Sequence, residues 1–372
     1  MKILRSLLAV CCVSAALFIS AEAAETPDIS AAAAVLMDAD SGRLLMELAP
    51  DEPRLIASTT KIMTAMLALE RCDPDMTVTV DPAWTGIEGS SMYLAPGQTL
   101  TVRELLQGLM LASGNDAAVA LACIAAGSVD AFSELMNEKA RELGCENTHF
   151  SNPNGLDGED HFASARDLAL MTRAALQDPR FRDIVSRTTA QIGENVYTNH
   201  NKLLGSCPGV FGVKTGYTAA AGRTLVSCCE REGVTLICVT LNDPDDWRDH
   251  EALYDWAYGA GALRDDLLEG SSWQVPVIGG TEEQVPVLPE KELPLFLLEG
   301  DTVNVVAQLP AFVYAEVSAG REAGRVRIYV NGAECASVPL RYGEDVARAV
   351  SVRSGWLADL RSFLERKIYT FS

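Results

Sequence analysis

The sequence is poor in histidine and in basic residues, and each shortage argues against a class of function. Only four histidines occur in 372 residues, none of them in an H-E-x-x-H pattern, and no paired C-x-x-C motifs are present. Few ligands are therefore available for a zinc site, and we expect no metal or other cofactor. Lys and Arg number 30 against 51 Asp and Glu, which gives a formal net charge of -21. Such a chain repels a phosphate backbone, so we expect no nucleic-acid partner.

Long apolar runs are also scarce. The clearest one extends from Leu7 to Ile19 and is shorter than the roughly 20 residues that cross a bilayer as a helix. Basic residues precede this run, and Ala21-Glu22-Ala23 follows it. This order is typical of a secretory signal peptide, which we assign to residues 1–23. The sequence therefore predicts export to the cell envelope, at the outer face of the cytoplasmic membrane.

Cysteine is present, but its pattern does not favour disulfides. Two of the ten cysteines lie in the predicted signal peptide, and Cys228 and Cys229 are adjacent. Others lie in apolar or helical surroundings, where free cysteine behaves as a small hydrophobic residue. We therefore expect buried thiols in a chain that is long enough to fold without disulfides.

The composition, with 48% hydrophobic and 22% charged residues, indicates a globular chain of about two domains. Residues 24–266 mix helical periods with short apolar strands, which predicts an α+β domain. Strands are expected at residues 33–37, 44–48, 225–229 and 234–241, a helix begins near Ser58, and two helical stretches lie within residues 102–126.

Prolines and period-two patterns replace the helices after residue 270. Val326, Ile328 and Val330 alternate with polar residues, and Asn331-Gly332 is a strong signal for a tight hairpin. Residues 271–350 are therefore predicted to form a small all-β domain.

The last segment, residues 354–372, has the pattern of an amphipathic helix. Its apolar positions include Trp356 and Phe363, and residues 353–372 hold four basic and two acidic side chains in an otherwise acidic chain. This combination predicts a helix that lies in the membrane interface. Packing of the helix on the β-rich domain is the alternative.

Three short motifs carry the candidate chemistry. Ser58-Thr59-Thr60-Lys61 places a hydroxyl and an amine about one helical turn apart, and a lysine with a lowered pKa can activate such a serine. Ser113-Gly114-Asn115 interrupts a helical stretch, and Lys214-Thr215-Gly216 lies in an expected strand. Each motif is weak alone. Together, and in this order, they form the S-x-x-K, S-x-N and K-T-G set of penicillin-recognising enzymes.

With these motifs the chain resembles the D-alanyl-D-alanine carboxypeptidases of the low-molecular-mass penicillin-binding protein family. The likeness covers about residues 30 to 260. It includes the stretches at 89–92, 94–97, 113–117, 136–140, 152–156 and 164–168. It implies a β-lactamase/transpeptidase-like fold, and the β-rich domain with its tail resembles the membrane-proximal part of the family.

The resemblance also implies roles for individual residues. Ser58 would be the acylated nucleophile, Lys61 its base and Ser113 a proton relay. Asn115 would orient Lys61 and the substrate, while Lys214 and Thr215 would bind the substrate carboxylate. Gly216 would leave room for the peptide, and the N–H groups of Ser58 and Tyr217 would form the oxyanion hole. The expected partners are a peptidoglycan stem peptide ending in D-Ala-D-Ala, and β-lactams as covalent inhibitors.

Several alternatives remain open from the sequence. A β-lactamase or a D,D-endopeptidase would use the same motifs, although Glu146 and Glu159 lack the E-x-x-L-N setting of class A β-lactamases. A non-catalytic envelope-binding protein would be expected to have lost the motifs, and all three are intact. The basic group that completes carboxylate recognition is also open, with His200 and Arg248 as candidates.

Overall fold

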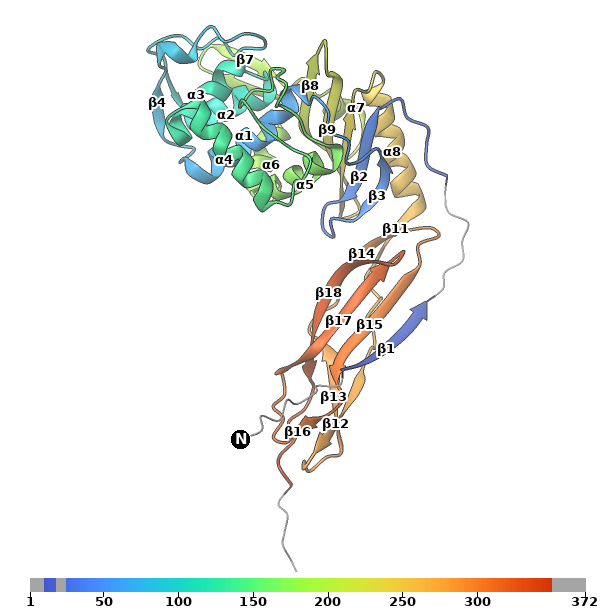
Figure 1. Ribbon diagram of the computed structural model, residues 1–372. Helices are drawn as coiled ribbons and strands as arrows, with labels where there is room; N and C mark the ends of the chain where they lie inside the picture. The colour runs from blue at the N-terminus through green and yellow to red at the C-terminus, as the bar shows by residue number, and fades with distance from the viewer. Residues whose placement is uncertain (1–9, 18–24, 350–372) are drawn as a thin grey trace, which may run out of the picture. The chain divides into compact units, whose positions relative to one another are not determined.

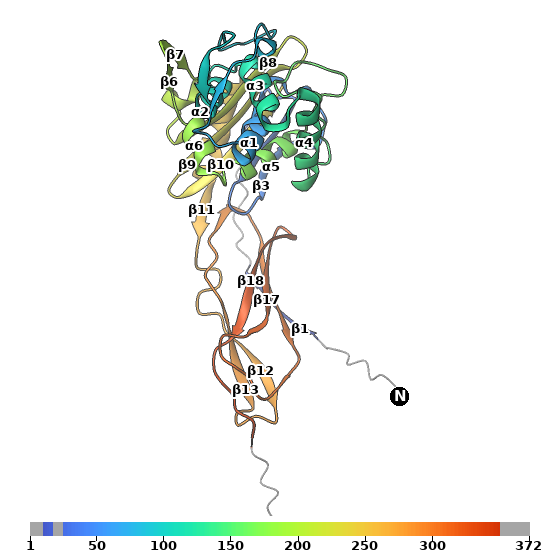
Figure 2. The same ribbon diagram turned by 90° about the vertical axis from the view of Figure 1, so that its left-hand side faces the viewer.

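The computed structural model describes residues 10–17 and 25–349, which divide into two units (Figures 1 and 2). Among the described residues, the mixed unit comprises 25–264 and Leu295–Asp301, and the β unit comprises Val10–Leu17, Asp265–Pro294 and 302–349. The α+β class and the two-part organisation agree with the sequence prediction.

A five-stranded antiparallel sheet forms the centre of the mixed unit, in the order β3-β2-β10-β9-β8. Its strands are β2 (Ala33–Asp38), β3 (Leu44–Leu48), β8 (Val210–Thr218), β9 (Gly222–Arg231) and β10 (Val234–Leu241). The four strand segments expected from the sequence are therefore present. Strand β8, which holds the K-T-G motif, is an edge strand, so one side of it is free to meet a ligand.

Alternate residues of this sheet enter two different cores. Leu225 and Leu236 pack with the helix α8 (Asp246–Ala260), whereas Val226 and Ile237 join the core of the other helices. Those helices are α1 (Lys61–Arg71), α2 (Val102–Leu111), α3 (Asn115–Ala126), α4 (Val129–Glu142), α5 (Ala165–Ala175) and α6 (Pro179–Val185). The short helix α7 (Leu203–Ser206) precedes β8. Layers of helix on both faces of the sheet thus bury it on both sides.

Local sequence explains where several helices begin. Thr101 and Glu104 form a capping box at α2, and Ser128, Ser164 and Asp178 accept backbone N–H groups at α4, α5 and α6. Two 3₁₀ turns, η1 (Ala57–Thr60) and η2 (Pro82–Trp84), and three small antiparallel ribbons complete the unit. The ribbons pair β4 (Thr77–Thr79) with β5 (Thr99–Thr101), β6 (Thr189–Ile192) with β7 (Asn195–Thr198), and β11 (Gly261–Arg264) with β14 (Leu295–Leu298).

The β unit is a seven-stranded sheet in the order β1-β15-β17-β18-β13-β12-β16. Its strands are β1 (Val10–Leu17), β12 (Trp273–Ile278), β13 (Gln284–Pro289), β15 (Val303–Pro310), β16 (Val313–Tyr314), β17 (Glu322–Val330) and β18 (Ala333–Tyr342). Asn331 and Gly332 both have positive φ, at 52° and 83°, and join β17 to β18 as the Asn-Gly signal predicts.

The sequence predicts a signal peptide at residues 1–23 and an amphipathic helix at residues 354–372. Val10–Leu17 of the predicted signal peptide pairs with β15 as strand β1 in the full-length chain. This pairing does not test cleavage, so the signal peptide stays a prediction. The predicted amphipathic helix at 354–372 lies outside the described residues.

Within the described part of the chain, no single helix is long and apolar enough to cross a membrane, although α3 and α4, bent by 82° at their junction, pass that test as a pair. Cys145, Cys207, Cys228, Cys229 and Cys238 are buried, as expected, whereas Cys72, Cys123 and Cys335 are only partly buried.

Candidate active site

The S-x-x-K motif lies where the 3₁₀ turn η1 passes into α1. Ser58 is the second residue of η1, and Lys61 is the first residue of α1. Ala57 has φ +46°, a strained value for a residue with a Cβ. Gly155 packs directly below this turn, where a Cβ would overlap the Ala57 carbonyl group. The backbone before the serine is thus held in an unusual conformation by close contact.

A buried hydrogen-bond pair supports the same turn. The Thr60 hydroxyl donates to the Ala57 carbonyl oxygen at 2.8 Å, and its Oγ1 lies 2.8 Å from Nε2 of the buried His161. The other ring nitrogen, Nδ1, accepts the Ser151 N–H at 3.1 Å. A neutral His161 therefore carries its proton on Nε2 and donates it to Thr60. Burial and the neighbouring charges of His149 and Lys61 lower the pKa of His161 to about 4.

Lys61 is fully buried, and three oxygen atoms surround its amine. Nζ lies 2.9 Å from Ser58 Oγ, 2.7 Å from Asn115 Oδ1 and 2.6 Å from the Asn154 carbonyl oxygen. The Asn115 Nδ2 group donates to the Glu88 carbonyl oxygen at 2.6 Å, which fixes Oδ1 towards the lysine. Of the three partners only the Ser58 hydroxyl can donate, so a neutral amine directs its lone pair at Ser58.

The electrostatic environment favours that neutral amine. Burial lowers the pKa of Lys61 well below its ordinary value, the nearby charge of Lys214 lowers it further, and Asp116 opposes both effects. Burial also lowers the pKa of Lys214 to about 7. Burial and the neighbouring charge of Lys214 thus disfavour the charged form of Lys61, which is the condition for a lysine to act as a base near neutral pH.

The S-x-N motif lies between α2 and α3. Ser113 has φ +58° and is almost completely buried, and Asn115 is the first residue of α3. The next residue, Asp116, accepts hydrogen bonds from Ser91 Oγ at 2.6 Å and from the Met92 and Leu94 N–H groups at 3.0 Å. This carboxylate fixes the 90–94 loop against the motif, and Ser90 of that loop lines the same pocket as Ser113.

The K-T-G motif lies in β8, where alternate residues face different environments. Lys214 is buried, and its Nζ donates to the Thr215 carbonyl oxygen at 3.0 Å. Gly216 lies against the nucleophile turn, because a Cβ there would overlap Thr224 Oγ1 and lie 3.0 Å from the Ser58 nitrogen. The exposed Tyr217 follows. The strand therefore approaches the turn too closely for any larger residue at 216.

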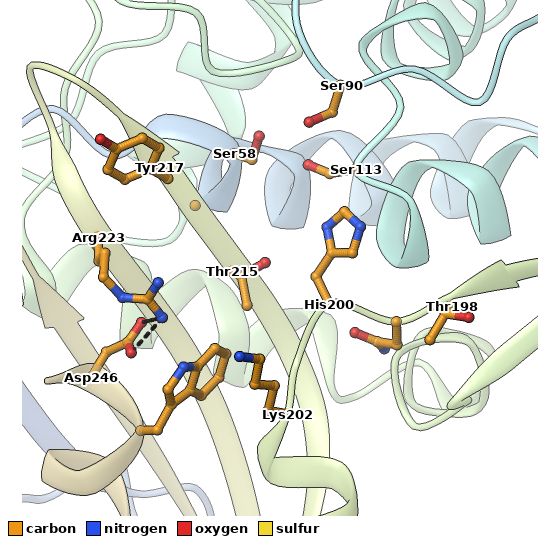
Figure 3. A pocket seen from close by; sticks show the side chains of 13 residues that line it. Ser58, Ser90, Ser113, Thr198, His200, Lys202, Thr215, Tyr217, Arg223 and Asp246 are labelled. Carbon is orange, nitrogen blue, oxygen red and sulfur yellow. Dashed lines mark hydrogen bonds and ion pairs between the residues drawn. The ribbon is translucent and has the colours of Figure 1, made fainter. Parts of the chain in front are cut away.

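One cavity of about 630 Å³ contains most of the predicted residues (Figure 3). Its lining includes Ser58, Ser113, Thr215, Gly216 and Tyr217. Lys61, Asn115 and Lys214 are buried, and Lys61 and Asn115 connect to Ser58 through the hydrogen bonds given above. The structure thus brings the three motifs into a single site.

Two basic residues that the sequence analysis did not single out also line this cavity. Arg223 donates to both oxygens of Asp246, at 2.7 and 2.8 Å, and lies over the Trp247 ring at 5.2 Å (Figure 3). Lys202 is the second. Arg223 pairs with Tyr217 across the β8–β9 hairpin. Pairing the K-T-G strand with the next predicted strand in the sequence could therefore have identified Arg223.

The two basic groups suggested by the sequence have different positions. His200 lines the cavity, and burial and the charge of Lys214 lower its pKa. Arg248 has a side chain that is 70% exposed, contacts Asp249 at 3.4 Å and is not part of the cavity lining. Between residues 25 and 349, no group of three His, Cys, Asp or Glu side chains could hold a metal ion.

Comparisons with known proteins identify the family of the chain. The D-alanyl-D-alanine carboxypeptidase family matches residues 20–245, and the C-terminal domain of penicillin-binding protein 5 matches residues 269–348. The chain is 30% identical to D-alanyl-D-alanine carboxypeptidase DacF of Bacillus subtilis, over 86% of both chains. It is 36% identical to DacB2 of Mycobacterium tuberculosis, over 62% of this chain and 84% of that protein.

Solved structures show the same relationship. Penicillin-binding protein 5 from Haemophilus influenzae superimposes with a TM-score of 0.74 at 29% identity, over 87% of this chain and 99% of that one. The family match spans more than half of the chain, and the match to DacF extends over most of both proteins. The chain therefore belongs to the D-alanyl-D-alanine carboxypeptidase family, as its motifs predict.

Proposed function

We propose that the chain is a serine-type D-alanyl-D-alanine carboxypeptidase in which Ser58 is the nucleophile. The observation that carries the residue assignment is the geometry of Lys61. Its amine has two partners that can only accept, Asn115 Oδ1 and the Asn154 carbonyl oxygen, and one that can donate, the Ser58 hydroxyl. A neutral Lys61 is thus positioned to take the Ser58 proton.

Acylation then proceeds in two proton transfers. Ser58 Oγ attacks the carbonyl carbon of the penultimate D-alanine, and its proton passes to Lys61. The C–N bond breaks as Ser113, which lines the same cavity, gives its proton to the departing amine and takes in its place the proton that Lys61 had accepted. The products are free D-alanine and an ester on Ser58.

The N–H groups of Ser58 and Tyr217 would stabilise the oxyanion in both halves of the reaction. The close approach of Gly216 to the Ser58 nitrogen supports this pairing of turn and strand. Loss of one such donor lowers the rate on the order of 100-fold. Water hydrolyses the ester in the second half, whereas a β-lactam leaves an acyl group that departs slowly and so inhibits the enzyme.

Binding of the substrate carboxylate is assigned to three groups. The buried Lys214 supplies positive charge next to Thr215, and Thr215 lines the cavity. Arg223 is the register partner of Tyr217 on β9 and is held by its hydrogen bonds to Asp246. It supplies a guanidinium group within the same cavity. An arginine held in this way loses little entropy when it binds a carboxylate.

The location of the protein follows from its substrate class and from the ends of the sequence. Peptidoglycan lies in the cell envelope, where the family acts. We propose that residues 1–23 direct export and that the amphipathic pattern of residues 354–372 binds the outer face of the cytoplasmic membrane.

The test is release of free D-alanine from a diacyl-D-Ala-D-Ala peptide by the protein without residues 1–23. We expect release that penicillin blocks and that Ser58→Ala abolishes, whereas Ser186→Ala, at an exposed serine directly after α6, leaves it unchanged. A crosslinked muropeptide is assayed in parallel. Cleavage of the crosslink without release from the linear peptide would make the enzyme an endopeptidase instead.

A further inference from the structure

Three large apolar side chains are exposed together at one end of the β unit. Ile278 at the end of β12 is 49% exposed, and Phe312 and Tyr314 are 47% and 67% exposed. Ile278 is the register partner of Tyr314 in the parallel β12–β16 pair. The rings of Phe312 and Tyr314 meet edge to face, with centroids 5.4 Å apart. We call these three residues the end cluster. Grouped apolar exposure of this kind marks an interaction surface more often than isolated exposed residues do.

The chain leaves the described structure beside this cluster. The Ala349 N–H donates to the Gly279 carbonyl oxygen at 2.9 Å, and the Thr281 N–H donates to the Ala347 carbonyl oxygen at 2.8 Å. Gly279 directly follows Ile278 in the sequence. The last described residue is therefore adjacent to the end cluster, at the end of the β unit where Figure 1 labels β12 and β16.

The sequence that continues from this point has the composition of a membrane-surface helix. It contains Trp356 and Phe363 among apolar positions spaced for one helical face, with basic residues between them. The segment begins only a few residues after Ala349. A helix bound at the membrane surface would therefore hold the end cluster within a short length of chain from the lipid headgroups.

We propose that the end cluster is a second membrane-contact surface, which inserts into the lipid headgroup region beside the C-terminal segment. Tyrosine is enriched at membrane interfaces, because its ring is apolar and its hydroxyl remains hydrated. Two weak attachments on one chain bind a surface far more strongly than either one alone. The inference rests on the membrane association proposed above for residues 354–372.

The charged residues near the end cluster indicate whether it binds a membrane through electrostatic attraction or through apolar insertion. Glu282, Glu283 and Glu316 lie close to it in the sequence, with Arg348 as the basic residue of the adjoining bridge. Their sum is negative, so anionic lipid does not attract the cluster. The cluster therefore acts through apolar insertion, and the dependence on anionic lipid comes from the basic residues of the C-terminal segment.

Vesicle binding tests the proposal with the chain from residue 24 to residue 372. Vesicles contain phosphatidylethanolamine with or without phosphatidylglycerol, and binding is measured by co-sedimentation. The double substitution Phe312→Ser and Tyr314→Ser should weaken binding by about tenfold or more on both kinds of vesicle. The matched control is Val196→Ser, an exposed apolar residue of the mixed unit, which should leave binding unchanged. Equal binding by the double variant and the parent would overturn the proposal.

A spectroscopic readout covers the case in which the double variant folds poorly. In Phe312→Trp, brominated lipids should quench the tryptophan emission more strongly than they quench the emission of the parent protein. Equal quenching in the two proteins would overturn the proposal. The emission of the new tryptophan is also measured in the absence of lipid, with and without residues 354–372. A change on deletion of these residues would show that the tail covers the cluster. Dimers that form without lipid and are lost in the double variant would assign the surface to a second copy. Either of these two results replaces the proposal.

Release of D-alanine from a soluble peptide is measured on the same samples. It should be equal in the parent and the end-cluster variants, because the substitutions lie in the β unit. Loss of release in the parent itself would count against the proposed enzymatic function and not against the membrane surface. A chain that ends at residue 353 should still show weak vesicle binding, which Phe312→Ser and Tyr314→Ser remove.

Discussion

Gly216 lies so close to Ser58 that a Cβ on the glycine would be 3.0 Å from the serine nitrogen, and it would also overlap the Thr224 hydroxyl. The K-T-G strand and the nucleophile turn therefore contact each other through backbone. We predict that Gly216→Ala lowers the rate of Ser58 acylation by about 100-fold, because the strand must move away from the turn.

The matched control for this substitution is Gly259→Ala, since a Cβ at 259 meets no atom within 4 Å. Acylation is followed by stopped-flow fluorescence with a labelled penicillin. Equal rates in the two variants would show that the close contact has no part in catalysis.

The charge of Lys214 contributes to the low pKa of Lys61 and so to the pH at which Lys61 can act. Burial has the largest effect in lowering the pKa of Lys61, and the charge of Lys214 has the second largest. Lys214→Met removes the second effect, so the pKa of Lys61 should rise towards its ordinary value. The acid limb of the acylation rate should then move to higher pH.

The control for the pH profile is Lys139→Met, which removes a partly exposed lysine that pairs with Glu70 and Glu142 on the helical side of the unit. Its acid limb should match that of the parent. An unmoved limb in Lys214→Met would mean that burial alone sets the pKa of Lys61.

His161 makes the stability of the nucleophile turn dependent on pH. Its pKa is about 4 when folded and near 6.5 when unfolded, so between these values the unfolded chain binds more protons. The free energy of unfolding should therefore fall as the pH drops from 6.5 towards 4, by about 3 kcal/mol at most from this group. His161→Gln should lose that part of the pH dependence in urea unfolding measured at both ends of the range.

Thr60→Val tests the same hydrogen-bond chain from the other side. It leaves the Ala57 carbonyl oxygen and His161 Nε2 without their shared hydroxyl partner, which should cost about 1 to 3 kcal/mol of stability. Thr60→Ser keeps the hydroxyl and should restore most of the loss. A serine variant as unstable as the valine variant would refute the hydrogen-bond explanation.

Arg223 should determine the affinity for the substrate carboxylate. We predict that Arg223→Gln raises KM for a D-Ala-D-Ala peptide by about tenfold and changes kcat much less, because a charge-assisted contact is lost in the substrate complex. Arg248→Gln removes an exposed arginine outside the cavity lining and should leave KM unchanged. A larger effect at Arg248 would reverse the assignment.

The motifs made much of the site predictable, because each has a local structural signature. The helix start at Ser58, the break at Ser113 and the K-T-G strand were expected, and they are present at η1, between α2 and α3, and in β8. The hairpin at Asn331-Gly332 was equally local, because both residues need positive φ.

Contacts between distant segments could not be predicted in this way. The Asn154 carbonyl oxygen bonds Lys61 from 93 positions away, and Gly155 supports the turn from a similar distance. Asn152-Pro153-Asn154-Gly155 is part of the likeness to the family, but its sequence does not show that folding brings it beneath the nucleophile. Arg223 was missed for a simpler reason, since an arginine after a glycine is typical of any exposed hairpin.

The central claim is that Ser58 is the acylated residue, and one measurement tests it directly. The protein is incubated with benzylpenicillin, its intact mass is measured, and the adduct is located by peptide mapping. We expect one penicilloyl group per chain, on Ser58, and none on the Ser58→Ala variant. An adduct on another serine, or an undiminished adduct in Ser58→Ala, would contradict it.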